Sequence, residues 1–128
     1  MPHPRRLGGG GRHLRKDTLM LRLYDDVCDW QNDARAICAR IELHDRNLAM
    51  QLRRSAQSVA LNLGEGMSAA GGVRRNAYAT ALREARECLV AIDVARRWGY
   101  VTEVSPTVLD RLDKIMATLF KLARPRTA

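Results

Sequence analysis

LAMQLRRSAQSVALNLGEG, residues 48–66, carries two parallel stripes of side chains when it is read as a helix. The apolar stripe consists of Leu48, Leu52, Ala56, Val59 and Leu63. This spacing is typical of a helix that packs against a hydrophobic core. The glycines on both sides of Glu65 predict that the helix ends at this point.

A polar stripe lies beside the apolar one and repeats with the spacing of a coiled-coil seam. Its members are Gln51, Ser55, Ser58, Asn62 and Glu65. Such short polar groups either face solvent and bond to nearby backbone carbonyls, or form a hydrogen-bonded interface with another helix or subunit. The sequence alone leaves both alternatives open.

Helical spacing of apolar residues divides the chain into four segments. These segments are 18–41, 46–64, 73–98 and 106–123. Asp17 is placed to cap the first of them, and Ser105 followed by Pro106 is typical of a helix start. Because the connections are short, we predict antiparallel neighbours and an all-α, up-down-up-down four-helix bundle over residues 18–123.

The net charge of +8 comes from the two ends of the chain. Residues 1–17 have the composition of a flexible basic arm, and residues 124–128 that of a basic tail. Residues 17–120 carry as many basic as acidic residues, so the expected body is neutral. Within that body the third helix is basic and the start of the first is acidic. This asymmetry serves either pairing between neighbouring helices or complementary surfaces on adjoining subunits.

No pattern of catalytic or metal-binding residues stands out. His3 and His13 lie in the arm and His44 lies in a loop, so no two histidines share a helical face. Neither a Glu-x-x-His pair nor a Cys/His cluster occurs. We therefore expect no enzymatic activity, no metal and no cofactor.

The remaining composition points to a cytoplasmic protein. Cys28, Cys38 and Cys88 show no paired spacing and are expected to be buried, reduced thiols. Trp30 is expected to make a partly buried contact. No apolar run is long enough to span a membrane.

The 48–66 stretch resembles the signature of the 23S rRNA intervening-sequence proteins, roughly Q-L-R-R-A-x-x-S-[IV]-x-x-N-[IL]-A-E-G. The matching residues are Gln51, Leu52, Arg53, Arg54, Ser58, Val59, Asn62, Leu63, Glu65 and Gly66. Tyr78 and the segment ARRWGY, residues 95–100, are similar to the third helix of that family, with Glu87 in the place of its recurrent acid. Ser55 and Gly64 depart from the usual alanine. The similarity spans about residues 19–122.

The resemblance implies an antiparallel four-helix bundle that assembles into ring-shaped homopentamers. It also extends to the accessory variability protein of diversity-generating retroelements, a pentameric barrel that binds nucleic acid and a reverse transcriptase. We therefore expect a non-enzymatic homo-oligomer that binds RNA or DNA. The alternative is a protein-interaction scaffold with no nucleic-acid role.

Two sets of residues follow from this expectation. The nucleic-acid contacts are expected at Arg53, Arg54, Arg74 and Arg75, with Arg5, Arg6 and Arg12 as auxiliary phosphate contacts. The family motif or interface residues are Gln51, Ser55, Ser58, Asn62, Glu65 and Glu87. Arg53 and Arg54 alternatively form salt bridges with the acidic start of a neighbouring first helix.

Overall fold

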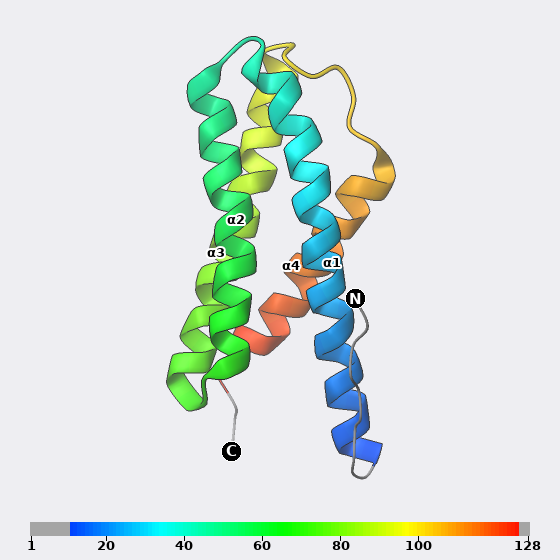
Figure 1. Ribbon diagram of the computed structural model, residues 1–128, viewed down its shortest axis with the longest axis vertical. Helices are drawn as coiled ribbons and strands as arrows, with labels where there is room; N and C mark the ends of the chain where they lie inside the picture. The colour runs from blue at the N-terminus through cyan, green and yellow to red at the C-terminus, as the bar shows by residue number, and fades with distance from the viewer. Residues whose placement is uncertain (1–10, 126–128) are drawn as a thin grey trace.

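The computed structural model describes residues 11–125, and it describes side chains from residue 18 onward. This part of the chain contains four helices and no strand, which confirms the all-α class. The helices are α1 (Gly11–Glu42), α2 (Arg46–Ser68), α3 (Gly71–Arg97) and α4 (Pro106–Ala123). Consecutive helices run in opposite directions, and α4 crosses behind the others at an angle (Figure 1). This arrangement is compatible with an up-down-up-down four-helix bundle.

Two helices are longer than the sequence indicated. α1 begins at Gly11 rather than near residue 18, so part of the expected arm is helical and Asp17 lies inside the helix instead of capping it. Each residue added to an existing helix gains a backbone hydrogen bond, which favours such an extension. α2 continues through both glycines to Ser68. Arg5 and Arg6 lie outside the described residues.

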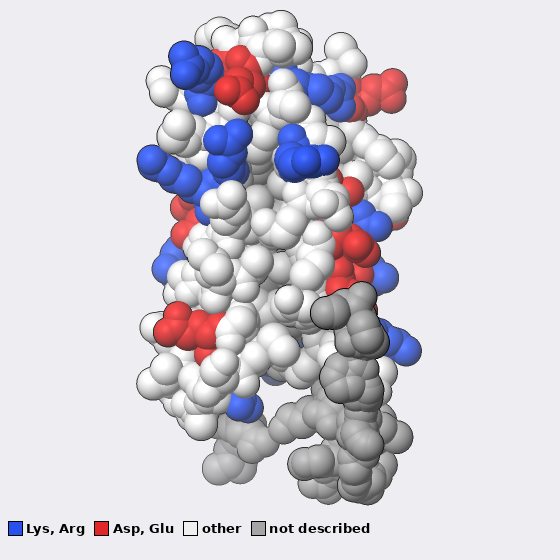
Figure 2. All heavy atoms as spheres, in the orientation of Figure 1, with Lys and Arg blue, Asp and Glu red and all other residues white. Residues whose placement is uncertain are grey.

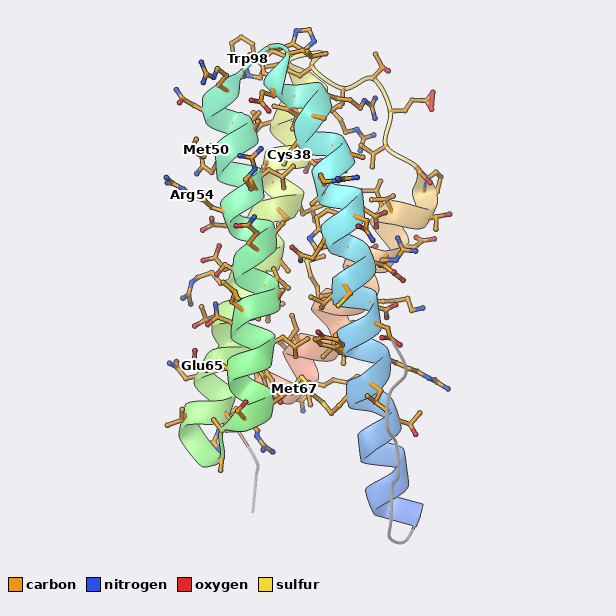
Figure 3. The ribbon with its side chains drawn as sticks, in the orientation of Figure 1. Cys38, Met50, Arg54, Glu65, Met67 and Trp98 are labelled. Atoms are coloured by element: carbon orange, nitrogen blue, oxygen red, sulfur yellow. The ribbon has the colours of Figure 1, made fainter. Side chains whose placement is uncertain are left out.

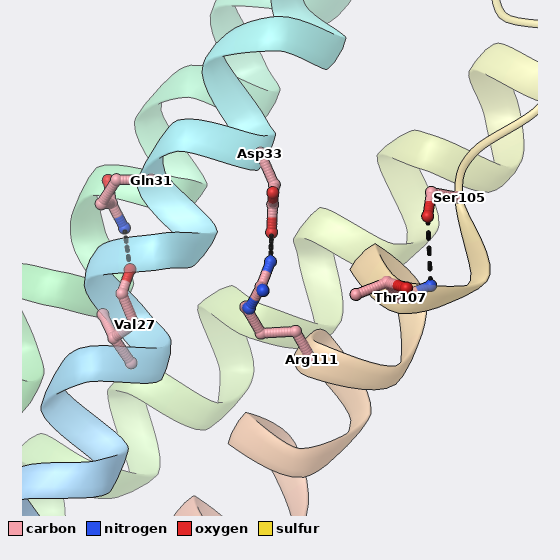
Figure 4. Close-up of polar contacts among 6 residues, drawn as sticks. All are labelled: Val27, Gln31, Asp33, Ser105, Thr107 and Arg111. Carbon is pink, nitrogen blue, oxygen red and sulfur yellow. Dashed lines mark hydrogen bonds and ion pairs between the residues drawn. The ribbon is translucent and has the colours of Figure 1, made fainter.

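Polar caps define the starts of α2 and α4. Asp45 Oδ1 accepts a hydrogen bond of 2.9 Å from the Leu48 amide. Ser105 Oγ accepts one of 3.2 Å from the Thr107 amide, which confirms the predicted start of α4 (Figure 4). Each cap satisfies a backbone N–H that lacks a partner within its helix.

The apolar stripe of α2 faces the core as predicted. Its members Leu52, Ala56, Val59 and Leu63 are buried, and Leu48 is half-buried. Trp30 is completely buried, so the expected partial exposure is wrong. Trp30 lies on the side of α1 that faces the core, so its large ring packs among side chains of the bundle.

Two polar contacts connect α1 with α4 and with the loop that precedes α4. The guanidinium of Arg111 on α4 forms an ion pair with the Asp33 carboxylate on α1 (Figure 4). Arg40 Nη2 donates a hydrogen bond of 3.2 Å to the Glu103 carbonyl in the α3–α4 loop. These contacts help fix α4 and its preceding loop against α1.

Candidate functional site

The polar stripe on α2 makes both kinds of contact that the sequence left open. Ser55 is buried, and its hydroxyl donates a hydrogen bond of 3.2 Å to Glu87 Oε1 on α3. Asn62 Nδ2 instead bonds locally, to the Ser58 carbonyl at 2.9 Å and its hydroxyl at 3.0 Å. Gln51 and Glu65 are exposed at the two ends. The stripe therefore serves a helix–helix contact at Ser55 and faces outward elsewhere.

A groove of about 530 Å³ runs between α1 and α2. Its charged lining residues are Arg35, Glu42 and Arg53, and its amide side chains are Gln31, Asn32 and Gln57. The Gln31 amide is fixed because Nε2 donates a hydrogen bond of 2.9 Å to the Ala56 carbonyl on α2. Arginines and amides are the side chains that proteins use to contact phosphates and base edges.

The two arginines of the family motif lie on this face of the molecule. Arg53 Nη2 stands 3.9 Å from Glu42 Oε1, and both side chains are about half exposed. An exposed ion pair of this length contributes little and leaves the guanidinium open to a ligand. Its partner lies at the end of α1 and not at the acidic start of a neighbouring first helix, the alternative that the sequence offers.

Arg54 is exposed and makes no hydrogen bond or ion pair within residues 18–125. Its side chain points away from α2 on the side remote from α1 (Figure 3). Figure 2 shows Lys and Arg side chains gathered over the upper half of α1 and α2 on this face. Arg35 and Arg53 line the same groove, and Arg54 is exposed next to Arg53 in the chain. We call these three residues the arginine row.

Arg74 and Arg75 do not belong to the arginine row. Arg74 Nε donates hydrogen bonds of 3.1 Å to the Gly66 carbonyl and 2.8 Å to the Ala69 carbonyl. The distance along α2 from Arg53 to Gly66 is about 20 Å at the helical rise. Arg74 thus caps the end of α2. The pair Arg53 and Arg54 therefore lies far along the bundle from the pair Arg74 and Arg75.

A second groove, of about 480 Å³, runs between α2 and α3. Its lining joins an apolar strip to charged and polar groups: Leu48, Val90, Ala91 and Val94 with Gln51, Arg83, Arg86 and Glu87. Gln51 and Glu87, two of the expected interface residues, both line this groove. Glu65 lies outside this groove, farther along α2.

An aromatic stack at one end of the molecule was missed by the sequence analysis. The His44 and Tyr100 rings are nearly parallel at 5.2 Å between centroids, and Trp98 follows Tyr100 at 6.3 Å. The segment ARRWGY was recognised, but its aromatic residues were given no role. Nothing in the local sequence indicates that His44 would meet them, because the contact joins two separate loops.

The described residues hold no cluster of side chains placed to bind a metal. No group of three or more His, Cys, Asp or Glu side chains from residue 18 to 125 is placed to hold a metal ion. Among the described residues, no helix is both long and apolar enough to cross a membrane. Cys38 and Cys88 are buried as expected, but Cys28 is exposed, which corrects that prediction, because its position on α1 faces away from the core.

These features define an all-α protein of four helices with grooves between neighbouring helices and a basic outer face. The family model described as 23S rRNA-intervening sequence protein matches residues 21–121. The chain therefore belongs to this family, as the motif on α2 indicated. No curated protein and no solved structure matches the chain.

Proposed function

We propose that this protein is a non-enzymatic, cytoplasmic homo-oligomer, a pentameric ring, that binds RNA or DNA through the arginine row. The observation that carries the nucleic-acid part is that Arg35 and Arg53 line the α1–α2 groove together with amide side chains. The exposed Arg54 follows Arg53 directly in the chain. Phosphate contacts supply most of the affinity for nucleic acid, and the neighbouring amides suit sugar or base contacts. Arg75 and the terminal arginines Arg5, Arg6 and Arg12 are auxiliary contacts in this proposal.

The assembly part of the proposal rests on two complementary faces. The first half of α1 exposes Leu21 and Tyr24 beside acidic residues such as Asp25 and Asp29. The α2–α3 groove offers apolar side chains next to Arg83 and Arg86. An acidic, partly apolar helix face fits such a groove, and a contact between two different faces repeats around a closed ring.

Binding of a labelled, single-stranded RNA at several salt concentrations tests the nucleic-acid part. The double variant Arg53→Ala/Arg54→Ala should bind at least about tenfold more weakly and show a salt dependence that is shallower by about two phosphate contacts. Lys114→Ala, an exposed cation on α4, is the matched control and should bind as the parent does. Equal binding by the double variant would contradict the role of the arginine row.

Light scattering behind a sizing column tests the assembly part on the same samples. A mass of five subunits supports the ring. A ring that ignores RNA at every salt concentration would instead support the protein-interaction scaffold.

A further inference from the structure

The aromatic stack leaves its last ring open to solvent. Trp98 is 70% exposed, although one side of it packs toward Tyr100 with an angle of 29° between the ring planes. Figure 3 places Trp98 at the same end of the molecule as the α1–α2 loop, beyond Arg54. A large ring that is supported on one side and open on the other is a surface for another flat ring.

Backbone contacts hold this surface in place. Gly99 adopts a positive φ of 78°, which turns the chain after α3, and the Tyr100 amide then donates a hydrogen bond of 2.8 Å to the Ala95 carbonyl. The His44 amide donates one of 2.8 Å to the Ile41 carbonyl at the end of α1. The rings are therefore presented by ordered turns, which lowers the entropic cost of binding.

The charged residues around the aromatic stack favour an anionic ligand that also lies along the α1–α2 groove. Glu42, which lines the groove, is two residues from His44 in the chain. Arg96 and Arg97 are exposed in the last turn of α3, immediately before Trp98. Of the acids nearby, Asp45 caps α2 and Glu42 stands 3.9 Å from Arg53.

We propose that Trp98, supported by Tyr100 and His44, stacks an unpaired base of a single-stranded nucleic acid. This inference rests on the proposed function and specifies its substrate as single-stranded, because the bases of a duplex are already stacked on one another. Stacking on an aromatic ring tolerates any base, so the site selects strandedness rather than sequence. The strand runs from phosphates at the arginine row to a base on Trp98.

Tryptophan fluorescence with a short, unstructured RNA tests this inference directly. Trp30 is fully buried, so binding at the surface should quench Trp98 alone. Trp98→Ala should abolish this quenching and weaken single-strand binding by about five-fold to a hundred-fold, while Trp98→Phe retains most of the affinity. Leu43→Ala, 82% exposed in the neighbouring loop, is the control and should leave affinity and quenching unchanged.

The same RNA annealed to its complement separates this inference from the proposed function. Weaker binding of the duplex, with no effect of Trp98→Ala on it, supports the inference. Equal binding of both forms, or single-strand binding that Trp98→Ala leaves intact, overturns the stacking role but leaves the arginine row in place. Absence of binding to either form overturns both.

Discussion

The hydroxyl of Ser55 donates a hydrogen bond to Oε1 of Glu87 and so joins α2 to α3. Ser55 is only 4% exposed, whereas Glu87 is an exposed residue. The carboxylate therefore reaches inward from the surface to satisfy a buried hydroxyl. Glu87 stands in the place of the family's recurrent acid, whereas Ser55 departs from the usual alanine, and this contact gives each of them a physical role.

The Ser55–Glu87 bond predicts an unequal effect of removing its two ends. Glu87→Ala leaves the buried hydroxyl without this partner and should lower the free energy of unfolding by about 1–3 kcal/mol. Ser55→Ala removes the buried polar group itself and should cost less, about 0.5–1.5 kcal/mol. Urea unfolding of both variants and of the double variant measures the coupling between them. Glu65→Ala is the control, and strictly additive effects would show that the bond contributes nothing.

Replacing each of two nearby glycines on α2 with alanine should change the stability of the protein in opposite directions. A Cβ on Gly66 would lie 2.4 Å from Cε1 of the buried Tyr78 ring, so Gly66→Ala should destabilise the protein by about 1–3 kcal/mol. A Cβ on Gly64 would meet nothing within 4 Å, and Gly64→Ala should stabilise the helix by about 0.5–1 kcal/mol. Thermal unfolding of the pair checks the sign of each effect, and a stabilising Gly66→Ala would be incompatible with this packing.

Arg74 should contribute to the free energy of unfolding. Because its Nε bonds to two carbonyls at the end of α2, Arg74→Ala should lower the free energy of unfolding by about 1–2 kcal/mol. Arg75→Ala, next to it and without such bonds, should change stability by no more than about 0.5 kcal/mol. Urea unfolding compares the two variants. Equal stability of Arg74→Ala and its parent would remove the capping role.

The three cysteines should differ in reactivity. Cys28 is exposed and should react rapidly with a thiol reagent in the native protein, while Cys38 and Cys88 should react only on unfolding. A count of rapidly reacting thiols, compared with Cys28→Ser as control, measures this. Fast reaction of more than one thiol would show that the core opens readily.

Cys88 also makes stability depend on alkaline pH. Burial raises the pKa of its thiol from 9.0 to about 12, and the neighbouring Trp30 opposes this rise only in part. Between these values the unfolded chain has lost a proton that the folded chain keeps, so stability falls as pH rises, by up to about 1.4 kcal/mol per pH unit. Burial raises the pKa of Cys38 and Tyr78 in the same direction. Urea unfolding measures this effect between these two pH values. The midpoint urea concentrations of the parent and of Cys88→Ala should converge as pH rises.

The sequence predicted the helices well because their signals are local. The apolar stripe of α2 and the Ser105 cap depend only on residue spacing and on neighbours in the chain. α2 ends at Ser68, later than its glycines predict, because neither Gly64 nor Gly66 stops the helix. Gly66 is instead the residue that lets Tyr78 of α3 approach, and such a reason depends on a contact between helices.

The candidate site was only partly predictable for the same reason. Arg53 and Arg54 were found from a motif, and they lie on the basic face. Arg35 was missed because its helix carries no comparable motif, and it joins them only across the α1–α2 groove. Arg74 looked equivalent to Arg53 in the sequence, but its hydrogen bonds to the end of α2 could be seen only once the turn was built.

The tight turn between α2 and α3 has a consequence for how the chain folds. Only Ala69 and Ala70 separate the two helices, and Gly71 adopts a positive φ of 59° at the start of α3. This pair also shares the most extensive helix–helix interface of the described chain. Contacts between segments so near in sequence form with little loss of chain entropy. We therefore expect the α2–α3 hairpin to be the folding nucleus, onto which α1 and then α4 dock.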